Sequence, residues 1–431
     1  MFVSECLSVN TKNHLDIGGC DTIDLIKEFG SPLYVMDESL VRKNCRTYKN
    51  AIDECYNGKG KIAYASKAFS CKYMYKIAKE EGLAIDVVSG GELYTAMQAG
   101  FPTSEVYFHG NNKSYAEIEM AIQNKVGRIV VDHIFELDTI DEIAKRLNAV
   151  PKISFRIKPG VDAHTHEFVQ TGGIDSKFGV ALETGEAMDI IKYAISLKNV
   201  EVVGIHCHIG SQIFIREPFE LAAKRLIALM CDVKEQTGVT LTELNLGGGY
   251  GIKYLESDDP IAYDEYIEAV SKVVKTVAAE CSFDLPNVVM EPGRSIVGSA
   301  GITLYTVGAV KEIPNIRTYV SVDGSLADNP RYTMYEALYE AVVANKAGNE
   351  RTHSYRVSGR CCETDTLIPD IKLCEVTPGD TLAVLATGAY NYAMSSNYNR
   401  LPRPAVVMVN NGAAKVVVKR ESYEDLIKND L

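Results

Sequence analysis

The chain has 431 residues, of which 46% are hydrophobic and 24% are charged, and its formal net charge is -12. A chain of this length exceeds the size at which one hydrophobic core usually stops growing, so we expect two domains. The acidic balance disfavours a nucleic-acid partner, because binding to phosphate backbones depends on clustered lysine and arginine side chains.

The amino-terminal residues and the cysteines bear on the cellular compartment. The first ten residues lack a basic stretch followed by an apolar run, so no signal peptide is expected. No apolar stretch reaches the roughly 18 residues that a membrane-spanning helix needs. Eleven cysteines without an export signal indicate reduced thiols rather than a disulfide framework. These features predict a cytoplasmic protein that does not enter a membrane.

From about residue 38 the chain alternates short apolar runs of β-forming residues with segments of helical spacing. Strands separated by single helices predict βαβ units, right-handed crossovers and a parallel sheet. Eight such units over about 250 residues favour an α/β fold with a closed (β/α)8 barrel of the TIM type over an open doubly wound sheet, the alternative. We predict strands at 61–65, 83–88, 105–109, 128–132, 152–157, 200–208, 241–246 and 287–291, and helices at 71–81, 91–99, 114–124, 136–147, 185–197, 218–237 and 263–279.

After residue 298 the pattern changes to short β-rich runs that are broken by Gly, Asn and Pro turns. This texture predicts a mainly antiparallel β domain, which an amino-terminal strand at 33–36 would join. The expected division is therefore a barrel at 38–298 and a β domain formed by 1–37 together with 299–431. Within the second part we predict strands at 302–310, 318–322, 354–358, 381–385, 405–409 and 415–419, and a helix at 335–343.

Barrel enzymes carry their chemistry at the carboxyl ends of the strands. Lys67 follows the first predicted barrel strand, although a lone lysine at a strand end is more often simply solvated. The triple glycine 247–249 follows the seventh strand, and its missing Cβ atoms let backbone amides approach an anion. The eighth strand is followed by EPGR, which offers Gly293 and Arg294. Two such loops after the last two strands indicate a phosphate-bearing ligand.

The sixth predicted strand ends with two histidines, His206 and His208, which are two residues apart and would share one face of the strand. Such a pair can bind a metal, sit in the core as satisfied imidazoles, or stack on a flat cofactor. A third metal ligand is not evident, so no metal centre is predicted. Ser211, just beyond, could bind a phosphate through its hydroxyl.

Taken together, the strand ends present a lysine amine, a phosphate cradle, an imidazole and the carboxylate of Glu291. Pyridoxal phosphate needs this set, because lysine supplies the Schiff base and an acidic side chain keeps the pyridine nitrogen protonated. The strand-end residues therefore point to pyridoxal 5'-phosphate as the cofactor.

Eight motifs, in order between about residues 32 and 404, resemble those of the fold type III pyridoxal-phosphate-dependent decarboxylases, which share the alanine-racemase/decarboxylase fold. Within that group they most resemble the diaminopimelate decarboxylase family. The motifs are YASKAF, DVVSGGEL, HCHIGSQI, NLGGGYGI, EPGRSIVG, DNPRYTMYEA, GRCCETDTL and GAYNYAMSSNYNRLPRP.

The resemblance implies roles for individual residues. Lys67 would form the Schiff base, His208 would stack on the cofactor ring, and Glu291 would take the pyridine nitrogen. Cys362 would be the proton donor, so Lys67 and Cys362 would be the two catalytic residues. Cys361 is expected in the core. The other cofactor-binding residues would be Ser211, Gly248, Gly249, Gly293, Arg294 and Tyr390, and the substrate-binding residues Arg294, Arg331, Tyr335, Glu363 and Tyr390.

The implied reaction is decarboxylation of meso-2,6-diaminopimelate to L-lysine and carbon dioxide, the last step of bacterial lysine biosynthesis. The family uses a homodimer in which Cys362 and Glu363 would reach the partner's active site. Two alternatives stay open: a decarboxylase of ornithine, arginine, D-lysine or carboxynorspermidine, and a non-catalytic pyridoxal-phosphate-binding regulator. A substrate without a distal carboxylate would leave Arg294 and Arg331 unpaired, and a regulator would not need the proton donor.

The chain departs from the family pattern at two places. Residues 364–366 are Thr, Asp and Thr where a small pair and an aspartate are common, and Ser325 stands where a second glycine is usual. Neither change touches a residue with an implied role, so the departures concern loop geometry rather than the reaction.

Overall fold

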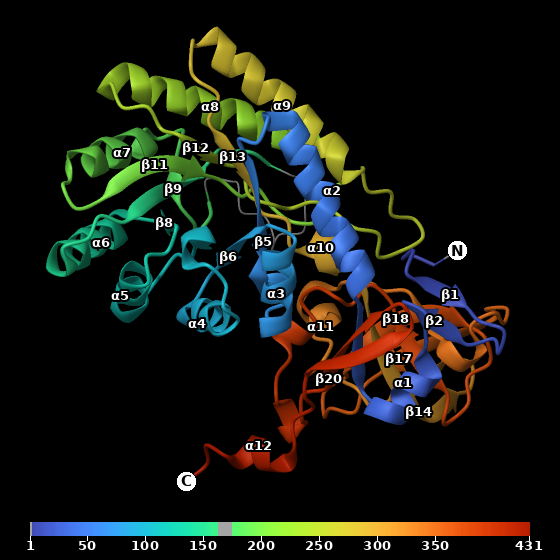
Figure 1. Ribbon diagram of the computed structural model, residues 1–431. Helices are drawn as coiled ribbons and strands as arrows, with labels where there is room; N and C mark the ends of the chain where they lie inside the picture. The colour runs from blue at the N-terminus through green and yellow to red at the C-terminus, as the bar shows by residue number, and fades with distance from the viewer. Residues whose placement is uncertain (1, 163–174) are drawn as a thin grey trace. The chain divides into compact units, whose positions relative to one another are not determined.

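The computed structural model describes residues 2–162 and 175–431. The chain forms two compact units (Figure 1). We call Cys45–Gly251 with Pro260–Gly293 the barrel unit, and Met1–Asn44 with Ile252–Asp259 and Arg294–Leu431 the sheet unit. The expected domain boundaries after residues 37 and 298 stay a prediction.

The barrel unit is built on eight parallel strands that close on themselves, because β5 pairs with both β6 and β13 while β9 pairs with both β8 and β11. The closed barrel is confirmed, and the open sheet is excluded. Each predicted barrel strand is present. The strands are β5 (Gly60–Ala65), β6 (Ala84–Val87), β7 (Val106–Phe108), β8 (Arg128–Val131), β9 (Lys152–Lys158), β11 (Glu201–His206), β12 (Glu243–Asn245) and β13 (Asn287–Met290), and the short β10 (Val180–Ala181) pairs with β9.

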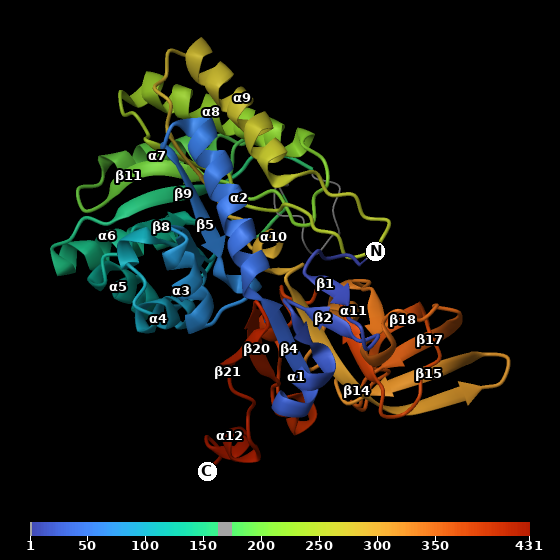
Figure 2. The same ribbon diagram turned by 45° about the vertical axis from the view of Figure 1, so that its right-hand side comes forward.

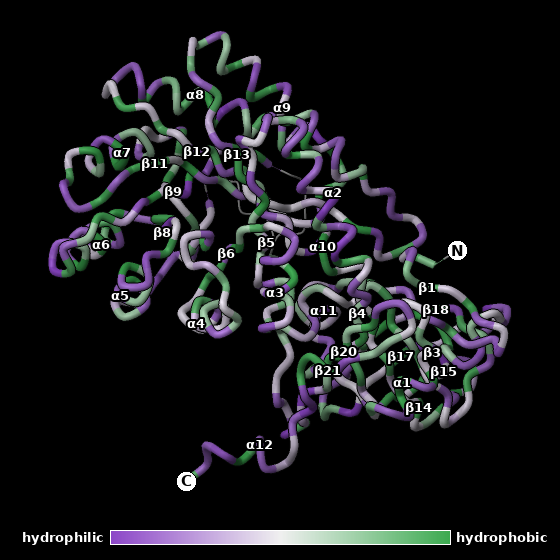
Figure 3. Tube along the Cα trace, viewed as in Figure 1, coloured by the Kyte–Doolittle hydropathy of each residue, from purple (hydrophilic) through white to green (hydrophobic). Residues whose placement is uncertain are grey.

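Helices α3 to α9 lie outside the barrel strands (Figures 1 and 2). The seven predicted helices are present as α3 (Lys72–Glu80), α4 (Gly90–Gln98), α5 (Tyr115–Gln123), α6 (Ile134–Leu147), α7 (Glu186–Ser196), α8 (Glu217–Thr237) and α9 (Tyr263–Glu280). Hydrophobic and hydrophilic residues alternate along them, as expected for helices with one buried face (Figure 3). Among the described helices, none has the length and apolar character needed to cross a membrane.

Helix α2 (Glu38–Tyr56) was not predicted from the sequence. It nevertheless carries a periodic signal, because its fully buried side chains recur every three or four residues and so form one stripe. These side chains are Val41, Cys45, Tyr48, Ile52 and Tyr56.

The sheet unit contains one large sheet in the order β18-β17-β15-β14-β4-β20-β21, and β19 joins it by pairing with β14 and β16 (Figure 2). The expected mainly antiparallel character is confirmed, although β15 with β17 and β4 with β20 are parallel. The strands are β4 (Leu33–Asp37), β14 (Gly301–Ile313), β15 (Arg317–Val322), β16 (Ala341–Val343), β17 (His353–Ser358), β18 (Thr366–Leu373), β19 (Thr381–Val384), β20 (Ala405–Asn410) and β21 (Ala413–Val418).

The prediction of a helix at 335–343 is wrong. Helix α11 spans Arg331–Tyr335, and Ala341–Val343 is strand β16, which pairs with β19. Glu336 ends the helix because its φ of 52° is left-handed. The β-branched residues at 342 and 343 favour the strand.

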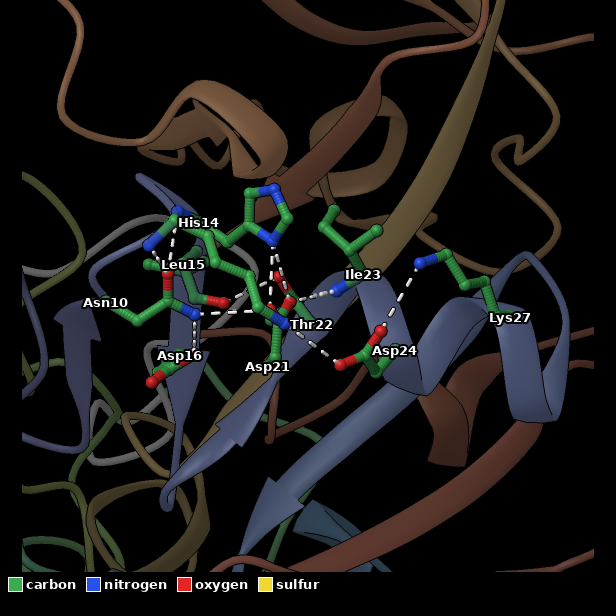
Figure 4. A network of polar contacts seen from close by, with 10 residues as sticks. Asn10, His14, Leu15, Asp16, Asp21, Thr22, Ile23, Asp24 and Lys27 are labelled. Atoms are coloured by element: carbon green, nitrogen blue, oxygen red, sulfur yellow. Dashed lines mark hydrogen bonds and ion pairs between the residues drawn. The ribbon is translucent and has the colours of Figure 1, made fainter.

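A polar network fixes the start of helix α1 (Thr22–Phe29) beside a small sheet of β1 (Leu7–Val9), β2 (Leu15–Ile17) and β3 (Cys20–Asp21) (Figure 4). Asp21 is the N-cap and accepts the Ile23 amide at 2.9 Å. The same carboxylate accepts His14 Nδ1 at 2.9 Å and Asn10 Nδ2 at 3.2 Å. These bonds satisfy orphan donors at the helix start and hold the small sheet against it.

Candidate active site

The loops that follow the sixth, seventh and eighth barrel strands are joined by backbone hydrogen bonds. The Ile213 amide donates to the Gly249 carbonyl at 3.0 Å, and the Glu291 amide donates to the Gly247 carbonyl at 2.7 Å. Because parallel strands of a barrel end at one rim, these bonds gather the two predicted phosphate loops and the loop of Ser211 side by side.

Lys67 lies directly after β5 in a short turn, Ser66–Ala68, and is half-buried. The Ala65 amide donates to the Pro292 carbonyl at 3.0 Å, so the first and eighth strand ends adjoin. A Cβ on Gly293 would lie 2.8 Å from the Ala65 Cβ, closer than carbon atoms approach. Glycine at this position therefore lets the eighth loop pack against the strand that presents Lys67.

The triple glycine is required by its surroundings. A Cβ on Gly248 would lie 2.0 Å from the Glu291 carbonyl oxygen, and one on Gly249 would lie 2.5 Å from the Gly210 carbonyl oxygen. Gly249 also has a φ of +123°, a conformation that other residues rarely adopt. The loop thus brings bare backbone to the rim, where amides can bind an anion.

His206 and His208 were expected to share one face of a strand, but β11 ends at His206 and His208 lies beyond it. The Gly248 amide donates to Nδ1 of His208 at 3.3 Å, so this nitrogen is an acceptor and carries no proton. Burial, followed by the positive charges of Lys67 and Arg156, holds the His208 pKa well below its usual value. The ring is therefore a neutral imidazole of fixed orientation.

Glu291 is the centre of a buried cluster at the same rim. Its Oε1 accepts Nε2 of His109 at 2.8 Å and Nδ2 of Asn245 at 2.7 Å, and its Oε2 accepts Nε2 of His206 at 3.1 Å. The three donors follow or end β7, β12 and β11, so separate strands converge on one carboxylate. We call these four residues the Glu291 cluster.

Burial alone would raise the pKa of Glu291, but the electrostatic attraction and the hydrogen bonds of the imidazoles of His109 and His206 hold that pKa well below its usual value. Burial lowers the pKa of His206 to about 3, so this ring donates as a neutral imidazole. The cluster therefore contains an ionised carboxylate. The ligand atoms of His109, His206 and Glu291 lie within 4.8 Å of one another and could hold a metal ion; the absence of a metal stays a prediction.

Two arginines of the sheet unit converge on one phenol. The Tyr254 hydroxyl accepts Nη1 of Arg294 at 2.7 Å and Nη1 of Arg331 at 2.9 Å. Arg331 Nη1 also donates to the Tyr339 hydroxyl at 2.6 Å. All four side chains are buried. We call them the Tyr254 cluster.

Tyr390 and Tyr335 accompany these arginines. The Tyr390 ring centroid lies 4.8 Å from Cζ of Arg294, a cation–π contact, and the residue has a left-handed φ of 62°. Tyr335 ends helix α11, four residues after Arg331, which places both side chains on one helix face.

Cys362 and Glu363 are exposed, whereas Cys361 is buried as predicted. The Cys362 amide donates to Oδ1 of Asn399 at 3.3 Å, and the Tyr398 hydroxyl donates to the Glu363 carboxylate. Among the described residues, no hydrogen bond joins Cys362 or Glu363 to the Tyr254 cluster.

Asp365 shapes the loop that carries Cys362. Its carboxylate accepts the amides of Leu326 and Cys361, each at 2.7 Å, and its φ of 44° is left-handed. Asp365, which departs from the family pattern, therefore stabilises the conformation of this loop.

Four residues of the two clusters had no role predicted from the sequence: His109, Asn245, Tyr254 and Tyr339. His109 and Asn245 lie at the ends of predicted barrel strands, but no signal in the sequence ranks them above other residues at strand ends. Tyr254 and Tyr339 lie in segments without a strand-end signal, so only the fold brings them to the arginines.

Comparison with known proteins identifies the family. The sequence model of the pyridoxal-dependent decarboxylases, pyridoxal binding domain, matches residues 38–298. The diaminopimelate decarboxylase of Bacillus subtilis (strain 168) is 47% identical over 432 residues and covers 100% of this chain and 98% of its own. That of Bacillus methanolicus is 49% identical over 422 residues, with 98% of both chains covered.

A solved structure agrees with the sequences. The crystal structure of diaminopimelate decarboxylase from M. jannaschii in co-complex with L-lysine has a TM-score of 0.93 and 34% identity, covering 100% of this chain and 99% of that chain. The chain therefore belongs to the diaminopimelate decarboxylase family of the pyridoxal-dependent decarboxylases.

Proposed function

We propose that the chain is a carboxy-lyase that converts meso-2,6-diaminopimelate to L-lysine and carbon dioxide with pyridoxal phosphate as cofactor. The observation that carries the substrate choice is the pair of buried guanidiniums of Arg294 and Arg331. A buried cation needs an anionic partner, and the second carboxylate of diaminopimelate supplies one. The names of the relatives, and L-lysine in the M. jannaschii structure, support the assignment.

The barrel residues fit the cofactor. The amine of Lys67 would bind its aldehyde carbon, and the bare backbone of Gly248 and Gly249, with Ser211 and Gly293, would hold its phosphate. The carboxylate Oδ1 of Asp86 and Nδ1 of His206 are buried without a hydrogen-bond partner in the described residues, as expected beside a polar ligand. When bound, the cofactor supplies an electron sink for the electron pair that carbon dioxide leaves behind.

Glu291 would hold a proton on the ring nitrogen of the cofactor. An ionised carboxylate stabilises a protonated nitrogen, and the imidazoles of His109 and His206 keep Glu291 ionised. The neutral ring of His208 would stack on one face of the cofactor and leave the other face for the substrate.

The sheet unit would bind the far end of the substrate. Arg294 and Arg331, with Tyr335, would take the distal carboxylate, because a planar guanidinium can grip a carboxylate through two parallel hydrogen bonds. Glu363 would take the distal ammonium, and Tyr390 would contact both cofactor and substrate. This orientation would select the carboxylate at the D-configured centre for loss.

Cys362 would donate the final proton. The bond to the carboxylate carbon breaks, carbon dioxide departs without the bonding electron pair, and a proton from the Cys362 thiol forms the new C–H bond. We propose a homodimer in which Cys362 and Glu363 serve the partner's site, a role to which their exposure is suited. A cytoplasmic location is proposed as well, since all eleven cysteines are free thiols.

An absorbance and product assay tests the proposal. The purified protein should bind pyridoxal phosphate with a visible absorbance band, and meso-diaminopimelate should yield equal amounts of carbon dioxide and lysine. Ornithine, arginine, D-lysine and carboxynorspermidine are assayed in parallel. Faster release of carbon dioxide from any of these four would contradict the substrate, and release from none of the five would indicate a cofactor-binding regulator.

A further inference from the structure

Tyr254 occupies an unusual place in the sheet unit, because one phenol oxygen accepts hydrogen bonds from two arginines. The distances from its Oη to Nη1 of Arg294 and of Arg331 are 2.7 and 2.9 Å. Both guanidiniums also lie near its ring, with Cζ to centroid distances of 5.8 and 5.1 Å. A single oxygen therefore fixes how far apart these two cations are held.

The backbone and ring of Tyr254 are anchored independently of the arginines. Oδ2 of Asp258 accepts the amides of Tyr254 and Leu255 at 2.9 and 3.0 Å. The ring packs edge-on against Tyr339, with centroids 5.4 Å apart and an interplanar angle of 89°. These contacts fix the position of the phenol oxygen, which accepts hydrogen bonds from both arginines.

The cluster brings two buried guanidiniums, those of Arg294 and Arg331, close to one phenol. In residues 2–162 and 175–431 no carboxylate forms an ion pair with Arg331, which donates instead to the phenol oxygens of Tyr254 and Tyr339. Arg331 is nevertheless only 7% exposed. Two buried cations with a phenol between them are prepared to receive an anion.

Tyr339 provides a comparison within the same cluster. Its hydroxyl accepts a hydrogen bond from Arg331 and donates one to Oδ1 of Asn391 at 3.3 Å, and burial raises its pKa to about 12, so it stays a neutral phenol. Burial would likewise raise the pKa of Tyr254, but the charges of Arg294 and Arg331 bring it below the usual value. The two guanidiniums therefore act more strongly on the hydroxyl of Tyr254 than on that of Tyr339.

We propose that Tyr254 is a positioning residue that holds the guanidiniums of Arg294 and Arg331 at the spacing required to bind the distal carboxylate, and that it thereby contributes to substrate choice. The inference rests on the proposed function and deepens it. The Tyr254 oxygen accepts one N–H of each guanidinium, so one atom holds the two guanidiniums beside each other.

The decisive experiment compares Tyr254→Phe with Tyr339→Phe, since each variant removes one buried phenol oxygen from the same cluster. Binding of pimelate, a dicarboxylate of the same chain length that has no amino group to react, is measured by calorimetry with the holoenzyme. Tyr254→Phe should weaken pimelate binding about tenfold or more, the usual effect of losing hydrogen bonds to charged groups, and Tyr339→Phe should weaken it less than about threefold. Thermal unfolding of both variants controls for damage to the fold.

Kinetics separate positioning from a structural role. In Tyr254→Phe the KM for meso-diaminopimelate should rise by the same factor as the dissociation constant of pimelate, while kcat and the cofactor absorbance stay within about twofold of the wild type. Should Tyr254→Phe fail to fold, Tyr254→Gln, which keeps an oxygen acceptor, should bind pimelate more tightly than Tyr254→Leu.

Three outcomes would overturn the inference. Equal effects of the two phenylalanine variants would make the shared acceptor irrelevant. Tighter pimelate binding by Tyr254→Phe would show that the phenol competes with the ligand, and no pimelate binding by the wild type would remove the carboxylate site. Each of these leaves the proposed function standing if the wild type decarboxylates meso-diaminopimelate, whereas that function fails when the wild type releases no carbon dioxide.

Discussion

In the barrel unit, the carboxylate of Glu291 accepts hydrogen bonds from two imidazoles and an amide; in the sheet unit, the phenol of Tyr254 accepts hydrogen bonds from two guanidiniums. Both clusters place one buried acceptor among several donors. In the Glu291 cluster the acceptor is charged and the His206 donor is neutral, whereas in the Tyr254 cluster the donors are permanently charged.

This difference indicates which ligand charge each cluster prefers. A buried, ionised carboxylate beside the neutral ring of His206 favours a protonated ring nitrogen, and a pair of buried guanidiniums favours an anion. A substrate with two carboxylates and a cofactor with a basic ring nitrogen supply both. The comparison holds only if the barrel unit binds the cofactor and the sheet unit sets the substrate requirement.

Lys67→Ala tests the first half of that condition and should have the largest effect. Without the amine, the protein should lose both the visible absorbance of the lysine-bound cofactor and the decarboxylase activity. Absorbance spectra and carbon dioxide release measure the two losses. Lys61→Ala is the matched control, because Lys61 lies on the strand that precedes Lys67 and its amine contacts Glu105 instead. Retained absorbance and activity in Lys67→Ala would refute the cofactor assignment.

Glu291→Gln should come next in size. The variant keeps the shape of the side chain but removes its charge, so kcat should fall about 10²-fold to 10³-fold, as when a preorganised electrostatic partner is lost. The absorbance band of the cofactor should shift as well, since its ring nitrogen would lose the proton. Glu243→Gln serves as control because Glu243, on the same barrel, pairs with Arg128 at 3.0 Å. If the control lowers kcat equally, the charge at 291 is not special.

The strand-end half of the site could be predicted because sequence order and spatial order agree in a barrel. Each strand neighbours the next, so the residues after β5, β12 and β13 must share a rim, and Lys67, Gly249 and Glu291 follow these strands. The partners of Glu291 could not be ranked in this way. His109 lies 182 positions from Glu291, and nothing in its own segment distinguishes it from a histidine that points elsewhere.

Two of the four residues of the Tyr254 cluster were predicted from the sequence, and the other two were not, for a related reason. Family motifs marked Arg294 and Arg331, but Tyr254, 40 and 77 positions away, has no motif of its own. The local pattern also gave a wrong prediction at 335–343, where helical spacing coincides with β-branched residues. Residues 341–343 form a strand because they pair with β19. Contacts between distant segments, rather than local preference, determine both features.

Arg331→Ala examines the sheet unit. Removing one guanidinium should raise the KM for meso-diaminopimelate by about 10-fold to 100-fold, because a charge-assisted pair is lost, and should leave the cofactor absorbance unchanged. Steady-state kinetics and spectra measure both. Arg356→Ala is the control, since Arg356 donates to the Pro369 carbonyl on a neighbouring strand. Loss of cofactor binding with an unchanged KM would show that Arg331 binds the cofactor rather than the substrate, and would contradict the assignment of substrate binding to the sheet unit.

The smallest expected effect is a difference in how the two clusters respond to acid. Arginines do not titrate, but burial lowers the pKa of His206 from 6.5 to about 3, so the unfolded chain takes up a proton there at a pH where the folded chain does not. Stability contributed by the neutral ring is thus fully present above pH 6.5 and falls as the pH drops toward 3. A single such proton changes the free energy of unfolding by at most about 1.4 kcal/mol per pH unit.

His206→Gln should flatten that slope between pH 6.5 and 5, a window in which carboxylates of ordinary pKa barely titrate. Urea unfolding at several pH values measures it, and Tyr339→Phe, which removes a buried group that does not titrate in this window, should keep the wild-type slope. Equal slopes in the wild type and His206→Gln would mean that His206 is protonated beside Glu291. The barrel cluster would then carry its own cation, and its preference for a protonated ring nitrogen would lose its electrostatic basis.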